Sequence, residues 1–192
     1  MKIALDAVGG DHGLAPNIDG AVQAANAFGV ELVLVGPEEP IRAELSSRGI
    51  GPGDSRFEIA DAPDLVGMNE EPVAACRAKP RSSIMVCAEL VAAGRAAGMV
   101  SAGNSGATMA AVTLWHLKRI PGILRPAIAV PIPTSKGVTV LLDAGANVDC
   151  KPDCKGLCLV CRKNRNLGDC GHASGGAESS TRPRLTPRPD KG

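Results

Sequence analysis

Three short segments of this sequence combine glycine with small polar side chains, as loops that bind anions do. They are GGDHG at 9–13, SAGNSGA at 101–107 and LDAGANVD at 142–149. Glycine lets the backbone approach a ligand closely, and backbone N–H groups at such turns and at helix N-termini donate hydrogen bonds to phosphate. One such loop is weak evidence because glycine also serves ordinary turns, but three together predict a phosphate site.

The side chains of these loops include groups that could act on a substrate. His12 could donate a hydrogen bond to phosphate or protonate a departing thiolate, although it could also simply stabilise its turn. Asn104 and Ser105 stand where a helix is predicted to begin, and capping that helix is compatible with phosphate on the same amides. The catalytic candidates are His12, Asn104 and Lys151, and the phosphate-binding candidates are Gly9, Gly10, Asp11, Gly13, Gly103, Ser105, Gly106 and Asn147.

Two carboxylates belong to the first of these segments or precede it. Asp6 and Asp11 are more typical of residues that brace a glycine loop through its N–H groups than of general bases. An unpaired carboxylate beside the ligand would repel an anion. We therefore interpret Asp11 as organising its loop.

The elements that must position the loops alternate between strand and helix. Apolar runs predict strands at 2–6, 31–35, 56–60, 98–102, 127–131 and 137–143. Apolar residues at helical spacing predict helices at 16–28, 40–48, 82–97 and 103–117, the third with Ser82 as its cap. Strands apolar on both faces, separated by helices, are typical of a mainly parallel sheet covered by helices on both sides. The sequence therefore predicts an α/β three-layer sandwich with the loops at the carboxyl edge of the sheet.

The 192-residue chain changes in character after Pro152. Residues 1–152 contain 13 Lys and Arg against 16 Asp and Glu, whereas residues 153–192 contain 8 against 4.

With two Phe and one Trp in the whole chain, stacking on bases is a poor expectation, and we predict no nucleic-acid binding. The N-terminus reaches Asp6 before an apolar segment of the length found in secretory signals can form, so we expect a cytoplasmic location with at most peripheral membrane contact.

The cysteines are unevenly distributed. Cys76 and Cys87 occupy helical positions and are predicted to be buried structural thiols, whereas five of the seven cysteines lie within 150–170. These five cysteines and His172 are residue types that bind zinc. Residues 153–192, however, show no periodicity of a helix or strand that could hold a metal site in place, so we predict that they are disordered and bind no metal. A zinc-dependent interaction module stays open as an alternative function.

Four segments carry a resemblance to a known family. MKIALDAVGGDHG, VSAGNSGATMA, RPAIAV and LLDAGANVDCKP closely resemble the bacterial phosphate acyltransferases of phospholipid synthesis, the PlsX family, with Val8 where the family usually has Met and Ser105 where it usually has Thr. The resemblance covers residues 1–152, and the family continues through a second half that 153–192 does not resemble. We interpret 1–152 as the N-terminal part of such a domain and 153–192 as a non-homologous tail, typical of a truncated, frame-shifted chain.

The resemblance implies transfer of a fatty acyl group from acyl carrier protein to inorganic phosphate, without a cofactor. The product, an acyl phosphate, would be used by a membrane glycerol-3-phosphate acyltransferase. It also implies a homodimer and a fold similar to the isocitrate and isopropylmalate dehydrogenases, here incomplete at the C-terminus. Acyl carrier proteins are acidic, so Arg77, Lys79 and Arg81 are candidates to dock one, with ordinary solvated surface as the alternative. A phosphate- or acyl-binding protein without catalysis is a further alternative, because the truncated chain could be inactive.

Overall fold

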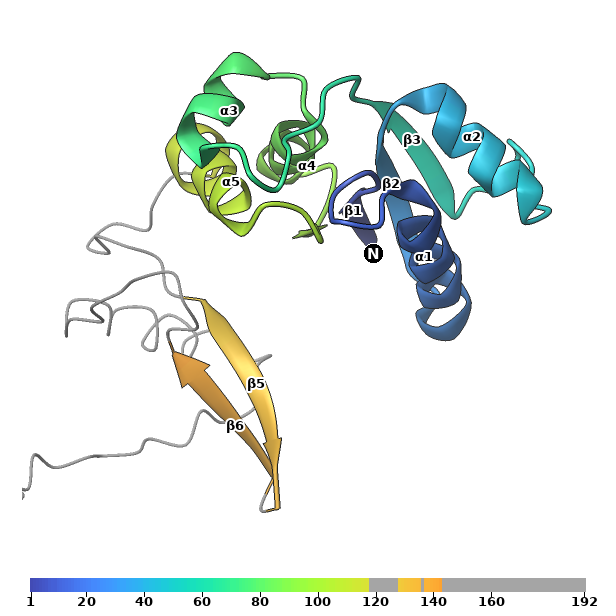
Figure 1. The fold of residues 1–192 in the computed structure, drawn as a ribbon. Coiled ribbons are helices and arrows are strands. Elements are labelled where there is room, and N and C mark those ends of the chain that lie inside the picture. The colour runs from blue at the N-terminus through green and yellow to red at the C-terminus, as the bar shows by residue number, and fades with distance from the viewer. Residues whose placement is uncertain (118–127, 136, 143–192) are drawn as a thin grey trace, which may run out of the picture.

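The computed structural model describes residues 1–117, 128–135 and 137–142 (Figure 1). Four parallel strands form one sheet in the order β3-β2-β1-β4: β1 Lys2–Asp6, β2 Glu31–Gly36, β3 Phe57–Asp61 and β4 Met99–Val100. The helices are α1 Leu14–Phe28, α2 Glu38–Ser47, α3 Pro72–Ala78, α4 Ser83–Ala92 and α5 Ser105–Ala110, which continues as a π-helical segment, Ala111–His116. The predicted α/β fold with a parallel sheet is confirmed.

Helices cover both faces of the sheet, which makes three layers (Figure 1). Leu32 and Leu34 are buried in one cluster with residues of α1 and α2. Val33 and Val35, which point to the opposite face because strand side chains alternate, are buried in another cluster with Cys87 of α4. Burial on both faces explains why β2 is a continuous apolar run.

The helix predicted over 82–97 ends earlier, at Ala92. Gly94 adopts the left-handed conformation (φ 70°), and the N–H groups of Arg95 and Ala96 both donate to the Leu90 carbonyl, which closes the helix. Ser82 stands at the N-cap position as expected, but its side chain makes no capping hydrogen bond. The early end leaves the chain free to turn into β4.

The strands predicted at 127–131 and 137–143 are β5 Ala129–Thr134 and β6 Gly137–Leu142, but they do not extend the parallel sheet. They pair with each other as an antiparallel hairpin, with Thr134 opposite Gly137. Pro131 and Pro133 have no N–H to donate, so β5 suits a strand with one neighbour. Both predicted strands are therefore present, as a hairpin separate from the mainly parallel sheet among the described residues.

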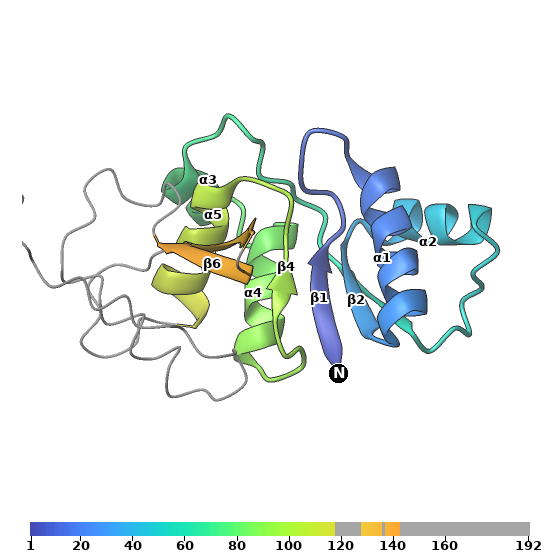
Figure 2. The same ribbon diagram turned by 90° about the horizontal axis from the view of Figure 1, so that it is seen from below.

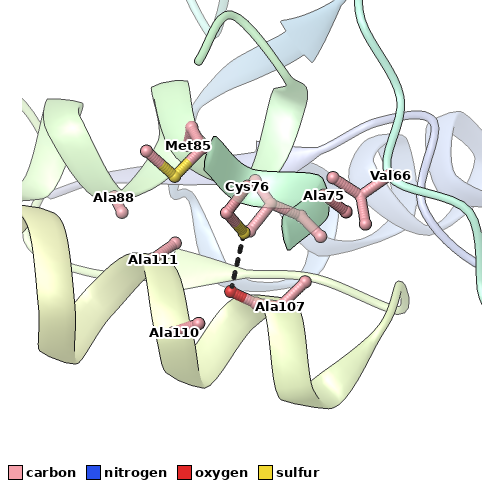
Figure 3. Packing of buried hydrophobic residues seen from close by; sticks show 9 residues of the cluster. Val66, Ala75, Cys76, Met85, Ala88, Ala107, Ala110 and Ala111 are labelled. Carbon is pink, nitrogen blue, oxygen red and sulfur yellow. Dashed lines mark hydrogen bonds between the residues drawn. The ribbon is translucent and has the colours of Figure 1, made fainter. Parts of the chain in front are cut away.

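Small side chains allow α3, α4 and α5 to pack closely (Figure 3). Cys76 of α3 is buried, and its Sγ donates to the Ala107 carbonyl at 3.6 Å. Burial, with a smaller effect of Glu71, raises the pKa of the Cys76 thiol, and burial raises the pKa of the Cys87 thiol strongly. Both side chains are therefore buried structural thiols, as predicted, and poor nucleophiles.

Candidate functional site

The first two glycine loops lie side by side because β1 and β4 are parallel neighbours. Leu5 pairs with Val100, so both strands deliver their loops at the same end of the sheet (Figure 2). The loops touch backbone to backbone: a Cβ on Gly9 would lie 3.0 Å from the Gly103 nitrogen, and one on Gly10 would lie 3.1 Å from the Ala102 carbonyl oxygen. Gly10 also has a positive φ of 97°. These positions therefore require glycine.

A buried carboxylate joins the two loops. Asp6, fully buried at the end of β1, accepts the Gly9 N–H at 3.0 Å with one oxygen and the Ser101 hydroxyl at 2.7 Å with the other. The Ser101 oxygen in turn accepts the Gly103 N–H at 3.0 Å. Asp6 thus braces the loops, as a carboxylate beside glycine was expected to do, while Ser101 had not been singled out. Its position two residues before a glycine is the signal for such a turn.

Asn17 of α1 holds the first loop from the other side. Its Nδ2 donates to the carbonyl oxygens of Ala7 at 3.0 Å and Gly9 at 2.8 Å. Because a trans peptide unit is planar, with its C=O and N–H pointing in opposite directions, the bond to the Gly9 carbonyl directs the Gly10 N–H away from Asn17. Nothing distinctive in the sequence marks Asn17, which lies inside α1.

Several backbone N–H groups on the two loops remain without a hydrogen-bond partner in the part of the chain that the structure describes. They include those of Gly10, Asp11, His12, Ser105 and Gly106. Such groups are the donors that phosphate recognition requires, and the last two begin α5. The two loops therefore offer unpartnered amides, the donors that anions bind, at one edge of the sheet.

The side chains of the candidate residues fall into different environments. His12, Asp11 and Ser105 are exposed, and none of them makes a side-chain hydrogen bond to another described residue. Gly13 has a φ of 71° and precedes α1. Gly106 serves packing as well, since a Cβ there would lie 2.6 Å from Pro72 Cγ of α3.

Asn104 is engaged inside the protein. Its Oδ1 caps α5 by accepting the Ala107 N–H at 3.0 Å, and its Nδ2 lies 3.3, 3.2 and 3.2 Å from the carbonyl oxygens of Gly67, Met68 and Glu70. Only 7% of its surface is exposed. This amide ties the 67–70 loop to the second glycine loop and has no spare N–H for a substrate.

The basic cluster is largely neutralised by neighbouring carboxylates. Lys79 Nζ binds both oxygens of Glu70 at 2.6 and 2.8 Å, and Arg81 binds Asp61 at 3.0 Å. Hydrogen bonds from Lys79 and then from the Gly67 N–H lower the pKa of Glu70. Arg77 is exposed and makes no ion pair with the residues that the structure describes, so it is the member that presents an uncompensated charge.

Several expectations concern residues outside the described ranges. These include most of the third glycine loop with Asn147, as well as Lys151 and the cysteine-rich tail. Among the described residues, no cluster of three or more His, Cys, Asp or Glu side chains could hold a metal ion. None of the described helices combines the length and apolarity needed to cross a bilayer.

Sequence relatives share most of this chain. Curated proteins named phosphate acyltransferase are 49% identical over 152 residues in Elusimicrobium minutum, 52% over 152 in Desulforamulus reducens and 53% over 154 in Deinococcus radiodurans. Each alignment covers 79% of this chain but only 44%, 44% and 41% of the respective relative. The chain therefore spans less than half the length of these relatives.

A solved structure and a family model complete the comparison. A phosphotransacetylase from Streptococcus pyogenes matches with a TM-score of 0.57 and 21% identity over 79% of this chain and 49% of that one, a likeness of fold alone. The family model described as "Fatty acid synthesis protein" matches residues 1–155. Since that match takes in both glycine loops and the whole parallel sheet, the chain belongs to this family, which includes the phosphate acyltransferases, as the sequence resemblance predicted.

Proposed function

We propose that this chain supplies the phosphate-binding part of an enzyme that transfers a fatty acyl group from acyl carrier protein to inorganic phosphate. The observation that carries the proposal is the set of unpartnered amides on two loops in contact, among the residues that the structure describes. The names of the relatives support acyl transfer to phosphate. Because these relatives are longer than this chain, the test below measures the activity of this chain by itself.

The chemistry needs little beyond positioning. A phosphate oxygen attacks the thioester carbonyl carbon, a C–O bond forms, the C–S bond breaks, and the sulfur leaves as a thiolate that takes up a proton. Hydrogen phosphate is a competent nucleophile and a thiolate is a good leaving group, so orientation and stabilisation of the oxyanion supply most of the rate. No cofactor is required.

We assign His12 the donation of a proton to the departing thiolate or of a hydrogen bond to phosphate. Its exposed place in the first loop, with no partner among the described residues, leaves the imidazole available. Asn104 acts by holding the second loop, because its amide is engaged internally. Asn147 and Lys151 are proposed to complete the site from the third loop.

The partners follow from the same reaction. Arg77 is proposed as the main contact for the acidic acyl carrier protein, with Lys79 and Arg81 contributing less because each already pairs with a carboxylate. The acyl phosphate would pass to a membrane glycerol-3-phosphate acyltransferase, which suits a cytoplasmic protein that touches the membrane at most peripherally. A homodimer is proposed for the full-length enzyme.

The test is turnover of a long-chain acyl carrier protein thioester with inorganic phosphate, followed by release of free thiol and by trapping acyl phosphate with hydroxylamine. We expect phosphate-dependent turnover that falls in His12→Ala. Phosphate binding without turnover would instead support the non-catalytic alternative. One equivalent of zinc in the purified protein, with no phosphate binding, would support the zinc module of the cysteine-rich tail.

A further inference from the structure

We infer that Asp6 and Ser101 are positioning residues for phosphate, an inference that rests on the proposed function of the two loops. Both side chains are engaged within the protein: Asp6 is fully buried and accepts hydrogen bonds at both oxygens, and the Ser101 hydroxyl donates to Asp6 and accepts from the Gly103 N–H. Their role is to fix the first loop relative to the second, so that unpartnered amides of both loops converge on one anion.

The directions of these hydrogen bonds explain why position 6 needs a carboxylate next to the Ser101 hydroxyl. The Gly103 N–H donates to the Ser101 oxygen, and the Ser101 hydroxyl donates its own hydrogen to Asp6. Asp6 is therefore an acceptor at both oxygens, since its other oxygen accepts the Gly9 N–H. An asparagine at position 6 would have one acceptor oxygen in place of two. If that oxygen kept the Gly9 N–H, its NH₂ group would face the Ser101 oxygen, whose own hydrogen would have lost its acceptor.

A chain of hydrogen bonds links the two loops directly. It runs from Gly9 through Asp6 and Ser101 to Gly103, and Asp6 and Ser101 are 95 residues apart in sequence. Phosphate binding needs donors from both loops in fixed relative positions, because a small displacement of one set weakens the bonds to the shared anion. Removing the Ser101 hydroxyl should therefore reduce phosphate affinity without removing any group that contacts phosphate.

The test compares Ser101→Ala with Ser101→Thr, which keeps the hydroxyl. Affinity for inorganic phosphate is measured by calorimetric titration of the full chain. We expect Ser101→Ala to bind about tenfold more weakly, the loss expected for one well-placed hydrogen bond, and Ser101→Thr to stay within about twofold of the wild type. Asp6→Asn, where it folds, should resemble Ser101→Ala.

A stability control separates positioning from general weakening of the fold. Leu45→Ala shortens a buried side chain of α2 beside Ile50 and Phe57, at the opposite edge of the parallel sheet from the loops, and should lower stability with unchanged phosphate affinity. Equal affinities of Ser101→Ala and the wild type would overturn the inference, as would a wild-type chain that binds no phosphate. Ser101-dependent phosphate binding without any turnover would support it while refuting the proposed enzymatic activity.

Discussion

Replacing Gly9 by alanine tests the contact between the two loops most severely. A Cβ at this position would overlap Asp6 Oδ2, lie 2.8 Å from Asp6 Cγ and lie 3.0 Å from the Gly103 nitrogen. The carboxylate cannot move aside without losing its bonds to the Gly9 N–H and the Ser101 hydroxyl, and it is fully buried. Either the loops separate or Asp6 loses its partners.

The expected cost follows from these two effects. Overpacking costs about 1–3 kcal/mol and a lost hydrogen bond to a buried charged group about 1.5–3 kcal/mol, so the free energy of unfolding should fall by roughly 3–5 kcal/mol. With a typical urea dependence for a small domain, the unfolding midpoint should fall by about 2 M.

The assay is urea unfolding followed by the fluorescence of Trp115, the single tryptophan, which packs against the cluster between α3, α4 and α5. Gly20→Ala is the matched control, because a Cβ there meets nothing within 4 Å and the residue lies within α1. It should raise the free energy of unfolding by about 0.5–1 kcal/mol. A Gly9→Ala midpoint equal to that of the wild type would refute the close contact.

Three further predictions concern the rest of the fold. Hydrogen bonds from Arg56 hold the pKa of Asp54 at about 2, below its ordinary 3.8. The stabilisation from these bonds is therefore complete above the ordinary value and is lost as the pH falls towards about 2. The urea unfolding midpoints of Asp54→Asn and the wild type should differ at neutral pH and converge in acid. The buried Ser83 hydroxyl has no partner in the described residues, so Ser83→Ala should raise the free energy of unfolding by about 1 kcal/mol in a urea titration, and a decrease would show that the hydroxyl is bonded. Cys76 and Cys87 should resist iodoacetamide in the native protein and react after denaturation, as peptide mapping would show; rapid native labelling would contradict their burial.

The sequence predicts the sheet well because its strands are short apolar runs that end in glycine loops. Lys2–Asp6 was predicted with the bounds that β1 has, and the loops after β1 and β4 meet as the parallel arrangement requires. The early end of α4 was missed because Ala96 and Ala97 continue an apolar helical pattern that Gly94 interrupts through its conformation alone. The seven-residue helix α3 was missed because so short a segment shows no clear periodicity.

The candidate site was predicted less completely. Glycines mark where a backbone can approach an anion, and the contact of Gly9 with the second loop agrees with that reasoning. Which polar side chains face outward depends on tertiary contacts: Asn104 turned inward because three carbonyl groups of the 67–70 loop lie beside it. Ser101 bonds to Asp6 because β1 and β4 are neighbours in the sheet, a contact between distant segments that no local pattern encodes.

The most direct test of the account is a titration of the isotopically labelled chain with inorganic phosphate, followed by amide NMR spectroscopy. We predict saturable shifts of the amides of Gly10, Asp11, His12, Ser105 and Gly106, the unpartnered donors of the two loops. The amides of residues 53–57, which lead into β3 at the opposite edge of the parallel sheet, should not shift. Shifts confined to exposed arginines such as Arg77, or no saturable shift in either loop, would contradict the claim that these loops form a phosphate site.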